Sequence, residues 1–332
     1  MSTPVLAADS IAPEEKTSGS RRPRFGSTVL KLLLDNRKAA VGAAILIAFA
    51  LIGIFAPQIA NYDPKAFVGR PHQPPSSEFW FGTDGSGKDV FSQAVWGTRI
   101  SYGTGAMVGI SVTFIGVVVG IAAGYFGGRI DDILSLITNV FLIIPGLPLI
   151  VVLAAFLPAG FLTIYWVLTV TGWAWGARVL RSQTLSLREK DFVGSAIVSG
   201  ESSARIMFRE ILPNMLSISV AGMFGAVTYA IGAQAGLEFL GLGDPSNISW
   251  GTSLYWAQNN SSLLVGAWWT FIPAGLSIAL LAFALSMINY AIDEVTNPRL
   301  RSQRDTQAAL RKVKQRLGSS RATPVIRKHG ER

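Results

Sequence analysis

The sequence predicts an all-α membrane protein with six transmembrane helices. Half of its residues are hydrophobic and 15% are charged, whereas about a quarter of the residues are charged in typical soluble domains. Eleven Lys and Arg follow Pro298, seven precede Ala39 and six lie between Arg178 and Pro213, but the three predicted external loops hold four together. Because cytoplasmic segments are enriched in Lys and Arg, both termini and the central loop are predicted to be cytoplasmic.

The first transmembrane helix is predicted at residues 39–56. Residues 1–28 before it are rich in Ser, Pro and charge without a helical period, which is typical of a disordered tail. A cleaved signal peptide is the alternative, but the basic segment is too long and the apolar run approaches spanning length. Residues 57–102 are polar, rich in Pro and Gly and balanced in charge, as suits an external loop.

The remaining spans are predicted at 101–126, 133–157, 161–180, 215–242 and 268–291, which gives one membrane domain at 29–300. The second span contains glycines that include several pairs four residues apart, a spacing that lets another helix approach closely. These are Gly105, Gly109, Gly116, Gly120 and Gly124. Pro145 and Pro148 predict a bend or break in the third span.

The tail at 301–332 is strongly basic. It is interpreted either as a cationic helix on anionic membrane lipid or as a disordered cytoplasmic segment. The formal net charge of +9 could suggest nucleic acid. The cations flank the predicted spans, however, which fits membrane topology better, so no nucleic-acid partner is predicted.

No catalytic residue, cofactor-binding residue or metal ligand is predicted. The chain has no Cys and two His, and it shows no Ser-His-Asp arrangement or metal-ligand cluster. Residues 82–89 read Gly-Thr-Asp-Gly-Ser-Gly-Lys-Asp, close to the phosphate loop G-x-x-x-x-G-K-[ST]. Asp89 replaces the hydroxyl that would ligate magnesium and would repel phosphate. We interpret this segment as a tight glycine turn that caps a helix beginning near Asp89.

The central loop, 181–213, is predicted to form two short helices that meet at Gly200. Phe192, Val193, Ala196 and Ile197 follow the spacing of one helical face. The second helix, over 202–210, is expected to end at Pro213, which a helix interior does not accommodate readily. Gly200 is expected to turn sharply and to pass close to a neighbour.

A motif in this loop reads Gly194-Ser195-Ala196, then Gly200, then Ile211-Leu212-Pro213. It resembles the cytoplasmic-loop signature of ABC importer permeases, which reads Glu-Ala-Ala, three residues, Gly, and some ten residues later Ile-Leu-Pro. Gly194 and Ser195 depart from that signature, where the family has Glu and the first Ala.

Three further segments extend the resemblance to the second permease subunit of dipeptide- and oligopeptide-type importers. Residues 81–92 resemble the family's Gly-Thr-Asp-x-x-Gly-Arg-Asp-Val-x-Ser, with Lys88 in place of Arg. Residues 239–251 resemble the family's Ser-Phe-Leu-Gly-Leu-Gly and Ser-Trp-Gly, with Glu238 in place of the first Ser, and residues 268–301 resemble its final span and exit. The matches cover about residues 25–301.

The resemblance implies the type I ABC importer permease fold and half of a translocation pathway for peptides or similar solutes in the bacterial plasma membrane. It also implies a homologous permease partner, an external substrate-binding protein, and two cytoplasmic ATPase subunits that carry ATP and Mg, so this chain itself is no enzyme. The residues implied to couple to the ATPase are Asp191, Phe192, Gly194, Ser195, Ala196, Gly200, Arg205, Arg209, Leu212 and Pro213. A self-contained secondary transporter or channel is the alternative, although the two halves do not match as they usually do in such proteins.

Polar residues in the last two spans are candidates for the pathway: Gln234, Glu238 and Asn289. A carboxylate in an apolar span is costly and usually faces a polar cavity or partner. For Glu238 a structural hydrogen bond or an interfacial position is the alternative. These positions depart from the family, so the substrate stays open among dipeptides, oligopeptides, oligosaccharides and metal chelates.

The predicted external stretch 243–267 places aromatic residues beside polar amides. Trp250, Tyr255 and Trp256 are therefore candidates for an interfacial helix that contacts the binding protein. An ordinary aromatic belt at the membrane surface is the alternative.

Overall fold

The computed structural model describes residues 36–296, and it describes side chains as far as Ile292. The regular elements of this part are helices, and no named strand occurs in it. They are α2 (Arg37–Ile54), α3 (Ala56–Ile59), α4 (Val90–Phe126), α5 (Gly128–Ile143), α6 (Gly146–Phe156), α7 (Phe161–Arg188), α8 (Asp191–Val198), α9 (Ser203–Arg205), the π-helix η1 (Ile206–Ile211), α10 (Leu212–Phe239), α11 (Trp250–Asn259), the 3₁₀-helix η2 (Trp268–Thr270) and α12 (Ile272–Thr296). The predicted tails, 1–28 and 301–332, lie outside the described residues.

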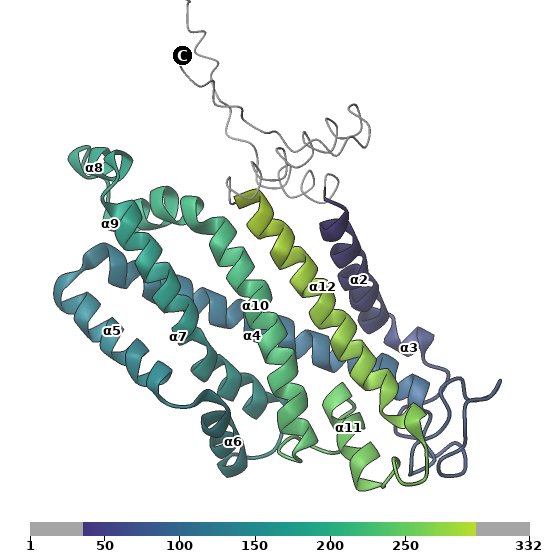
Figure 1. Ribbon diagram of the computed structural model, residues 1–332. Coiled ribbons are helices and arrows are strands. Elements are labelled where there is room, and N and C mark those ends of the chain that lie inside the picture. The colour runs from purple at the N-terminus through teal and green to yellow at the C-terminus, as the bar shows by residue number, and fades with distance from the viewer. Residues whose placement is uncertain (1–35, 297–332) are drawn as a thin grey trace, which may run out of the picture.

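The helices form a bundle in which α4 lies against α7 and α10 (Figure 1). The pair α2 and α12 packs beside them, and α5 packs on α4 and α7. The start of α2, the end of α12 and the short helix α8 lie at one end of the bundle, whereas α3, α6 and α11 lie at the other (Figure 1). The described chain therefore begins and ends on the side that carries α8.

The glycines of α4 allow its close approach to two neighbours, as their spacing predicts. A Cβ atom at Gly109 would collide with Val227 of α10. At Gly120 it would lie 2.6 Å from the carbonyl oxygen of Ala177 and 2.9 Å from Cβ of Leu180, both in α7. Small residues permit this backbone-level packing between membrane helices.

The predicted break in the third span is confirmed, since α5 and α6 meet at an angle of 86°. Ile144 ends α5 with an extended backbone, φ −70° and ψ 128°. A residue before proline is pushed out of the helical region by the proline ring. Pro145 then precedes the first residue of α6, and the chain changes direction there.

The glycine turn before α4 is confirmed as well, and α4 begins at Val90, next to the predicted start near Asp89 and 11 residues before the predicted span at 101–126. Gly82 and Gly87 adopt positive φ angles of 69° and 80°. Oδ2 of Asp89 accepts a hydrogen bond of 2.8 Å from the backbone N–H of Ser92. This is the usual way in which an aspartate caps the first turn of a helix.

Four of the described helices, α2, α4, the continuous run 203–239 and α12, are long and apolar enough to cross a membrane, and the bent pair α5–α6 would make a fifth. The segment α7 does not qualify because Trp, Tyr, Thr and Arg residues lower its hydropathy. The chain is thus a helical membrane protein, and a count of six spans stays a prediction.

Candidate functional site

The helix α8 extends from the end of the bundle, directly after α7 (Figure 1). Val193 anchors it: this side chain is fully buried in a cluster with Ile206, Ile211 and Met215. Ala196 packs against the same cluster. One side of α8 is therefore held by the start of the long run that becomes α10.

Three apolar side chains of α8 are exposed, and they point in different directions around the helix. Phe192 is 37% exposed, Ile197 53% and Val198 89%. Phe192, Val193, Ala196 and Ile197 share one face of α8, as their spacing predicts, but only the middle of that face is covered: Val193 and Ala196 pack on the bundle, while Phe192 and Ile197 at its edges are exposed. Large apolar side chains exposed on a short helix that projects from the bundle are available for contact with a partner.

Gly200 ends α8 with a Schellman turn. Its φ is +76°, its N–H donates to the carbonyl oxygen of Ile197 at 3.0 Å, and the N–H of Glu201 donates to that of Ala196 at 3.1 Å. This hydrogen-bond pair needs a left-handed residue, which glycine supplies without a Cβ penalty. The sharp turn predicted for Gly200 is confirmed. A Cβ there would meet no atom within 4 Å, so the expected close neighbour is not found among the described residues.

The second part of the loop starts at Ser202, whose Oγ accepts a hydrogen bond of 3.4 Å from the N–H of Arg205. Nε of Arg205 lies 3.3 Å from Oε1 of Glu201. Arg209 is exposed, as are Asp191, Gly194 and Ser195, whereas Leu212 is half-buried.

The expectation that this second helix ends at Pro213 is wrong. The chain continues through Pro213 into α10, by way of the π-helix Ile206–Ile211. Proline has no N–H, and its ring would clash with the carbonyl four residues earlier in a regular α-helix. The wider π turn resolves this: the N–H of Leu212 donates to the carbonyl oxygen of Met207, five residues back.

The pathway candidates Gln234 and Glu238 lie together near the end of α10 and are buried. Oε1 of Glu238 accepts from Nε2 of Gln234 at 3.0 Å, and Oε2 accepts from Oγ of Ser249 at 2.5 Å. The backbone of Gly251 approaches this carboxylate so closely that a Cβ atom there would collide with it. The hydrogen bonds of Glu238 therefore join α10 to the start of α11. The third pathway candidate, Asn289, is not part of this group: it lies half-buried near the far end of α12.

Replacing Glu238 by glutamine is expected to weaken the attachment of α11. The amide keeps one acceptor oxygen where the carboxylate has two, so Gln234 and Ser249 can no longer both donate to it as they do now, and leaving a buried donor unpaired costs about 1–3 kcal/mol. We expect a lower unfolding temperature of the purified full chain and reduced uptake, with Gln258→Ala on the exposed side of α11 as the control. Wild-type stability and uptake in Glu238→Gln would show that these hydrogen bonds contribute little.

The expectation that Trp250 contacts a binding protein does not fit the structure. This side chain has no exposed surface. Its Nε1 donates to the carbonyl oxygen of Ala94 at 3.2 Å, and its ring meets Phe49 edge-on at 5.6 Å. Trp250 instead holds α11 against α2 and α4.

Tyr255 and Trp256 are half-buried, and Nε1 of Trp256 donates to the carbonyl oxygen of Pro245 at 3.0 Å. Trp256 lines a pocket of about 330 Å³ together with Lys65 and Lys88. The sequence analysis did not predict this pocket. Beside the pocket, hydrogen bonds from Ser246 lower the pKa of Asp244. This end of the bundle offers both charged and aromatic groups.

Sequence reasoning also missed Val198 as an exposed apolar residue, together with the anchoring roles of Ile206 and Ile211. A signal for Val198 was present, since it is the last apolar residue before the turn at Gly200. The burial of Ile206 and Ile211 depends on packing against α4 and α7. Local periodicity does not report such contacts.

Comparison with known families gives two matches. A family model described as "binding-protein-dependent transport system inner membrane component" matches residues 116–302. The chain belongs to this family. A model of the N-terminal transmembrane domain of oligopeptide transport permease C matches residues 25–75. The predicted resemblance to the second permease subunit of dipeptide- and oligopeptide-type importers is confirmed.

Individual relatives of this permease family are similar along nearly their whole length. The oligopeptide transport system permease protein OppC of Bacillus subtilis is 32% identical over 297 residues, 89% of this chain and 96% of the relative. The dipeptide transport system permease protein DppC of the same organism is 32% identical over 285 residues, 85% and 88%. DppC of Alkalihalophilus pseudofirmus is 33% identical over 275 residues, 82% and 89%. The chain is therefore an ABC-type permease and a multi-pass protein of the bacterial plasma membrane.

Proposed function

We propose that this chain is a permease subunit of an ATP-driven importer and forms half of a translocation pathway for peptides or similar small solutes. The names of its relatives, which include oligopeptide and dipeptide transport permeases, support this substrate class. The other half of the pathway would come from a homologous permease. An external substrate-binding protein would deliver the solute, and two cytoplasmic ATPase subunits would bind and hydrolyse ATP with Mg.

The observation that carries this proposal is that α8 is anchored to the bundle by a buried side chain while its other large apolar side chains are exposed. Val193 fixes the helix to the bundle, and Phe192, Ile197 and Val198 are left for a partner. Fully burying side chains of this kind contributes about 1.5–3 kcal/mol each. A docked ATPase would therefore bind α8 stably. Movement of the ATPase would displace the start of α10, because Val193 joins α8 to it through the buried cluster with Ile206 and Ile211.

The proposed topology has six spans, with both termini in the cytoplasm. Its support is the arrangement of the described chain, whose two ends lie on the side of α8, and the basic residues concentrated at the same segments. The span count includes α7, which runs alongside α4 although its composition is less apolar. The segment 57–89 and α11 would then face the external binding protein.

Labelling of single cysteines tests this topology, because the chain contains no native Cys. Ser261→Cys at the α11 end and Ser202→Cys beside α8 replace two exposed serines at opposite ends of the bundle. In sealed cells an impermeant thiol reagent is expected to label Ser261→Cys and to leave Ser202→Cys unlabelled until the cells are permeabilised. Outside labelling of Ser202→Cys would overturn the proposed orientation and with it the docking of α8.

A further inference from the structure

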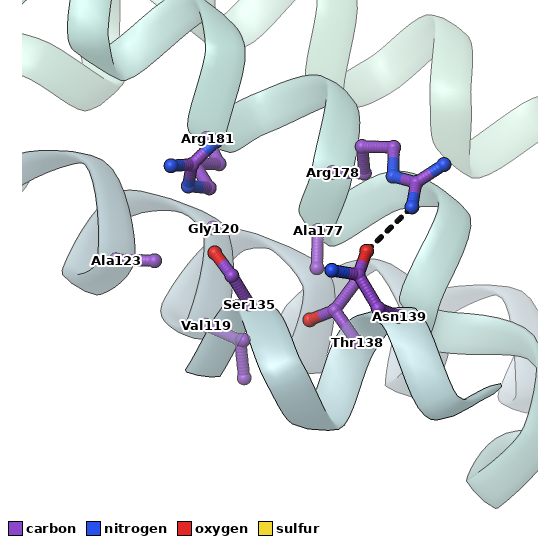
Figure 2. Close-up of a pocket in the computed structure, with 9 residues that line it drawn as sticks. All are labelled: Val119, Gly120, Ala123, Ser135, Thr138, Asn139, Ala177, Arg178 and Arg181. Carbon is purple, nitrogen blue, oxygen red and sulfur yellow. Dashed lines mark hydrogen bonds between the residues drawn. The ribbon is translucent and has the colours of Figure 1, made fainter. Parts of the chain in front are cut away.

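A polar pocket of about 190 Å³ lies between α4, α5 and α7 (Figure 2), and its lining includes no residue of α8 and not Glu238. It is lined by Val119, Gly120, Ala123, Ser135, Thr138, Asn139, Ala177, Arg178 and Arg181. Its volume is several times the roughly 30 Å³ that one water occupies in the liquid. Two guanidinium groups thus border a space large enough for a small polar group.

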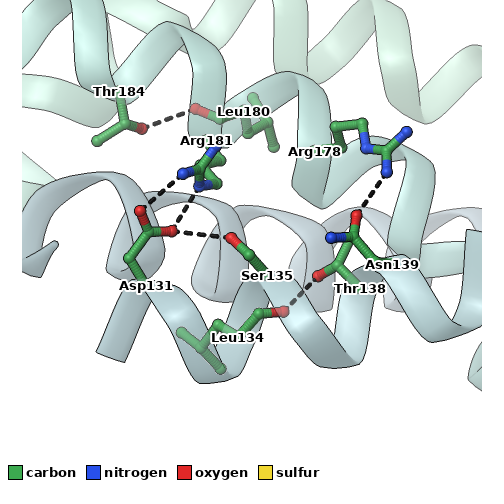
Figure 3. A network of polar contacts seen from close by, with 9 residues as sticks. All are labelled: Asp131, Leu134, Ser135, Thr138, Asn139, Arg178, Leu180, Arg181 and Thr184. Carbon is green, nitrogen blue, oxygen red and sulfur yellow. Dashed lines mark hydrogen bonds and ion pairs between the residues drawn. The ribbon is translucent and has the colours of Figure 1, made fainter. Parts of the chain in front are cut away.

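One of the two guanidinium groups is already neutralised. Nε and Nη2 of Arg181 donate to the two carboxylate oxygens of Asp131 at 2.5 and 2.7 Å (Figure 3). Ser135 donates to the same carboxylate at 2.9 Å. This bidentate pair fixes the geometry of the pocket wall and leaves little net charge on it.

The other guanidinium, that of Arg178, keeps its charge. Its Nη2 donates to Oδ1 of Asn139 at 2.6 Å, a neutral acceptor, and the two side chains point toward one another across the gap between α7 and α5 (Figure 2). Among residues 36–292 no carboxylate lies within ion-pair distance of Arg178. A guanidinium has five N–H donors and stays protonated, so most of its donors are left for a ligand.

The surroundings of Arg178 have the composition of a membrane interface. Trp175, three residues earlier on α7, is 68% exposed, and Leu136 and Val140 of α5 are 64% and 49% exposed. Tryptophan and arginine beside an apolar surface are typical of the level of the lipid headgroups. The end of α7 leads directly into α8, so in the proposed topology this level is the cytoplasmic one.

We propose that Arg178 and Asn139 bind the phosphate of an anionic phospholipid, with the headgroup in this pocket and the acyl chains along the apolar face of α5. The free donors of Arg178 and the amide Nδ2 of Asn139 supply hydrogen bonds to the phosphate oxygens. Basic pockets between membrane helices on the cytoplasmic side suit acidic headgroups. The choice of leaflet rests on the proposed function, but the pocket and its charge do not.

Native mass spectrometry of the delipidated full chain, titrated with phosphatidylglycerol or with phosphatidylcholine, tests this site. We expect the wild type to retain phosphatidylglycerol, and Arg178→Gln to bind it about tenfold more weakly, as loss of a charged hydrogen bond predicts. Asn139→Asp should have a similar effect, because the new carboxylate pairs with Arg178 and repels phosphate. Arg188→Gln removes the same charge from an exposed position of the same helix and should bind as the wild type does.

Three outcomes would overturn the proposal. Equal retention of phosphatidylglycerol by the wild type, Arg178→Gln and Asn139→Asp would show that the pocket is not the site. Displacement of the lipid by glycerol 3-phosphate at equal concentration would assign the pocket to a soluble phosphate compound. Loss of a co-expressed permease partner in Arg178→Gln, with lipid binding intact, would assign Arg178 to a subunit contact. Each of these results is independent of cysteine labelling, so failure of the lipid site and failure of the topology are distinguishable.

Discussion

Replacing Gly120 by valine is expected to prevent α4 and α7 from packing at their native distance. Any Cβ at this position would lie 2.6 Å from the carbonyl oxygen of Ala177 and 2.9 Å from Cβ of Leu180. The obstacle is backbone, which cannot rotate away as a side chain can, so the cost should reach or exceed about 3 kcal/mol, the upper end of ordinary overpacking. The yield of detergent-stable chain and its unfolding temperature measure the effect.

Gly103→Val is the matched control, since Gly103 lies on the same helix and a Cβ there meets no atom within 4 Å. Valine has a slightly better helix propensity than glycine, so this variant should be neutral or mildly stabilising. Equal loss of yield in both variants would mean that the glycines of α4 act through helix propensity and not through close packing.

Gly200→Val is expected to weaken the contact between α8 and the ATPase subunits while leaving the membrane-spanning helices intact. The residue holds φ at +76° in the Schellman turn, and forcing a β-branched residue into that region costs about 1–3 kcal/mol. Because the space around Gly200 is open, the cost comes from backbone strain and not from a collision within the chain. The exposed apolar side chains of α8 should lose their orientation, so copurified ATPase and substrate-stimulated hydrolysis should fall together.

Gly200→Asn separates backbone strain from other effects, because asparagine tolerates the left-handed conformation better than other non-glycine residues. This variant should retain most of the ATPase that the wild type copurifies, and Gly200→Ala should fall between Asn and Val. Full uptake and ATPase retention in Gly200→Val would exclude the turn as part of the docking element.

Sequence reasoning predicted features that depend on local chemistry. The cap at Asp89, the break at Pro145 and the turn at Gly200 each follow from the backbone preferences of one or two residues. The glycine spacing of α4 predicted its close packing because a four-residue period places the glycines on one side of a helix. Charge distribution predicted that both termini and the central loop are cytoplasmic. The start of α2, the end of α12 and α8 do lie at one end of the bundle, and their cytoplasmic placement stays a prediction.

Features set by distant partners were not predictable in the same way. Trp250 looks like an interfacial aromatic in the sequence, yet it is buried by Phe49 and Ala94, far away along the chain. Pro213 suggests the end of a helix, but a π turn absorbs it and keeps the run continuous into α10. The hydrogen bond that joins Glu238 to Ser249 depends on how the start of α11 is placed against α10, and a charged residue in an apolar segment gives no information about that placement.

Purification of the tagged full chain in mild detergent, followed by reconstitution in liposomes, tests the central claim that it acts as the permease of an ATP-driven importer. The account predicts that ATPase subunits copurify with the chain in a constant ratio and that uptake of peptide requires ATP, those subunits and the external binding protein. Uptake by the chain alone, without ATP and driven by an ion gradient, would contradict it.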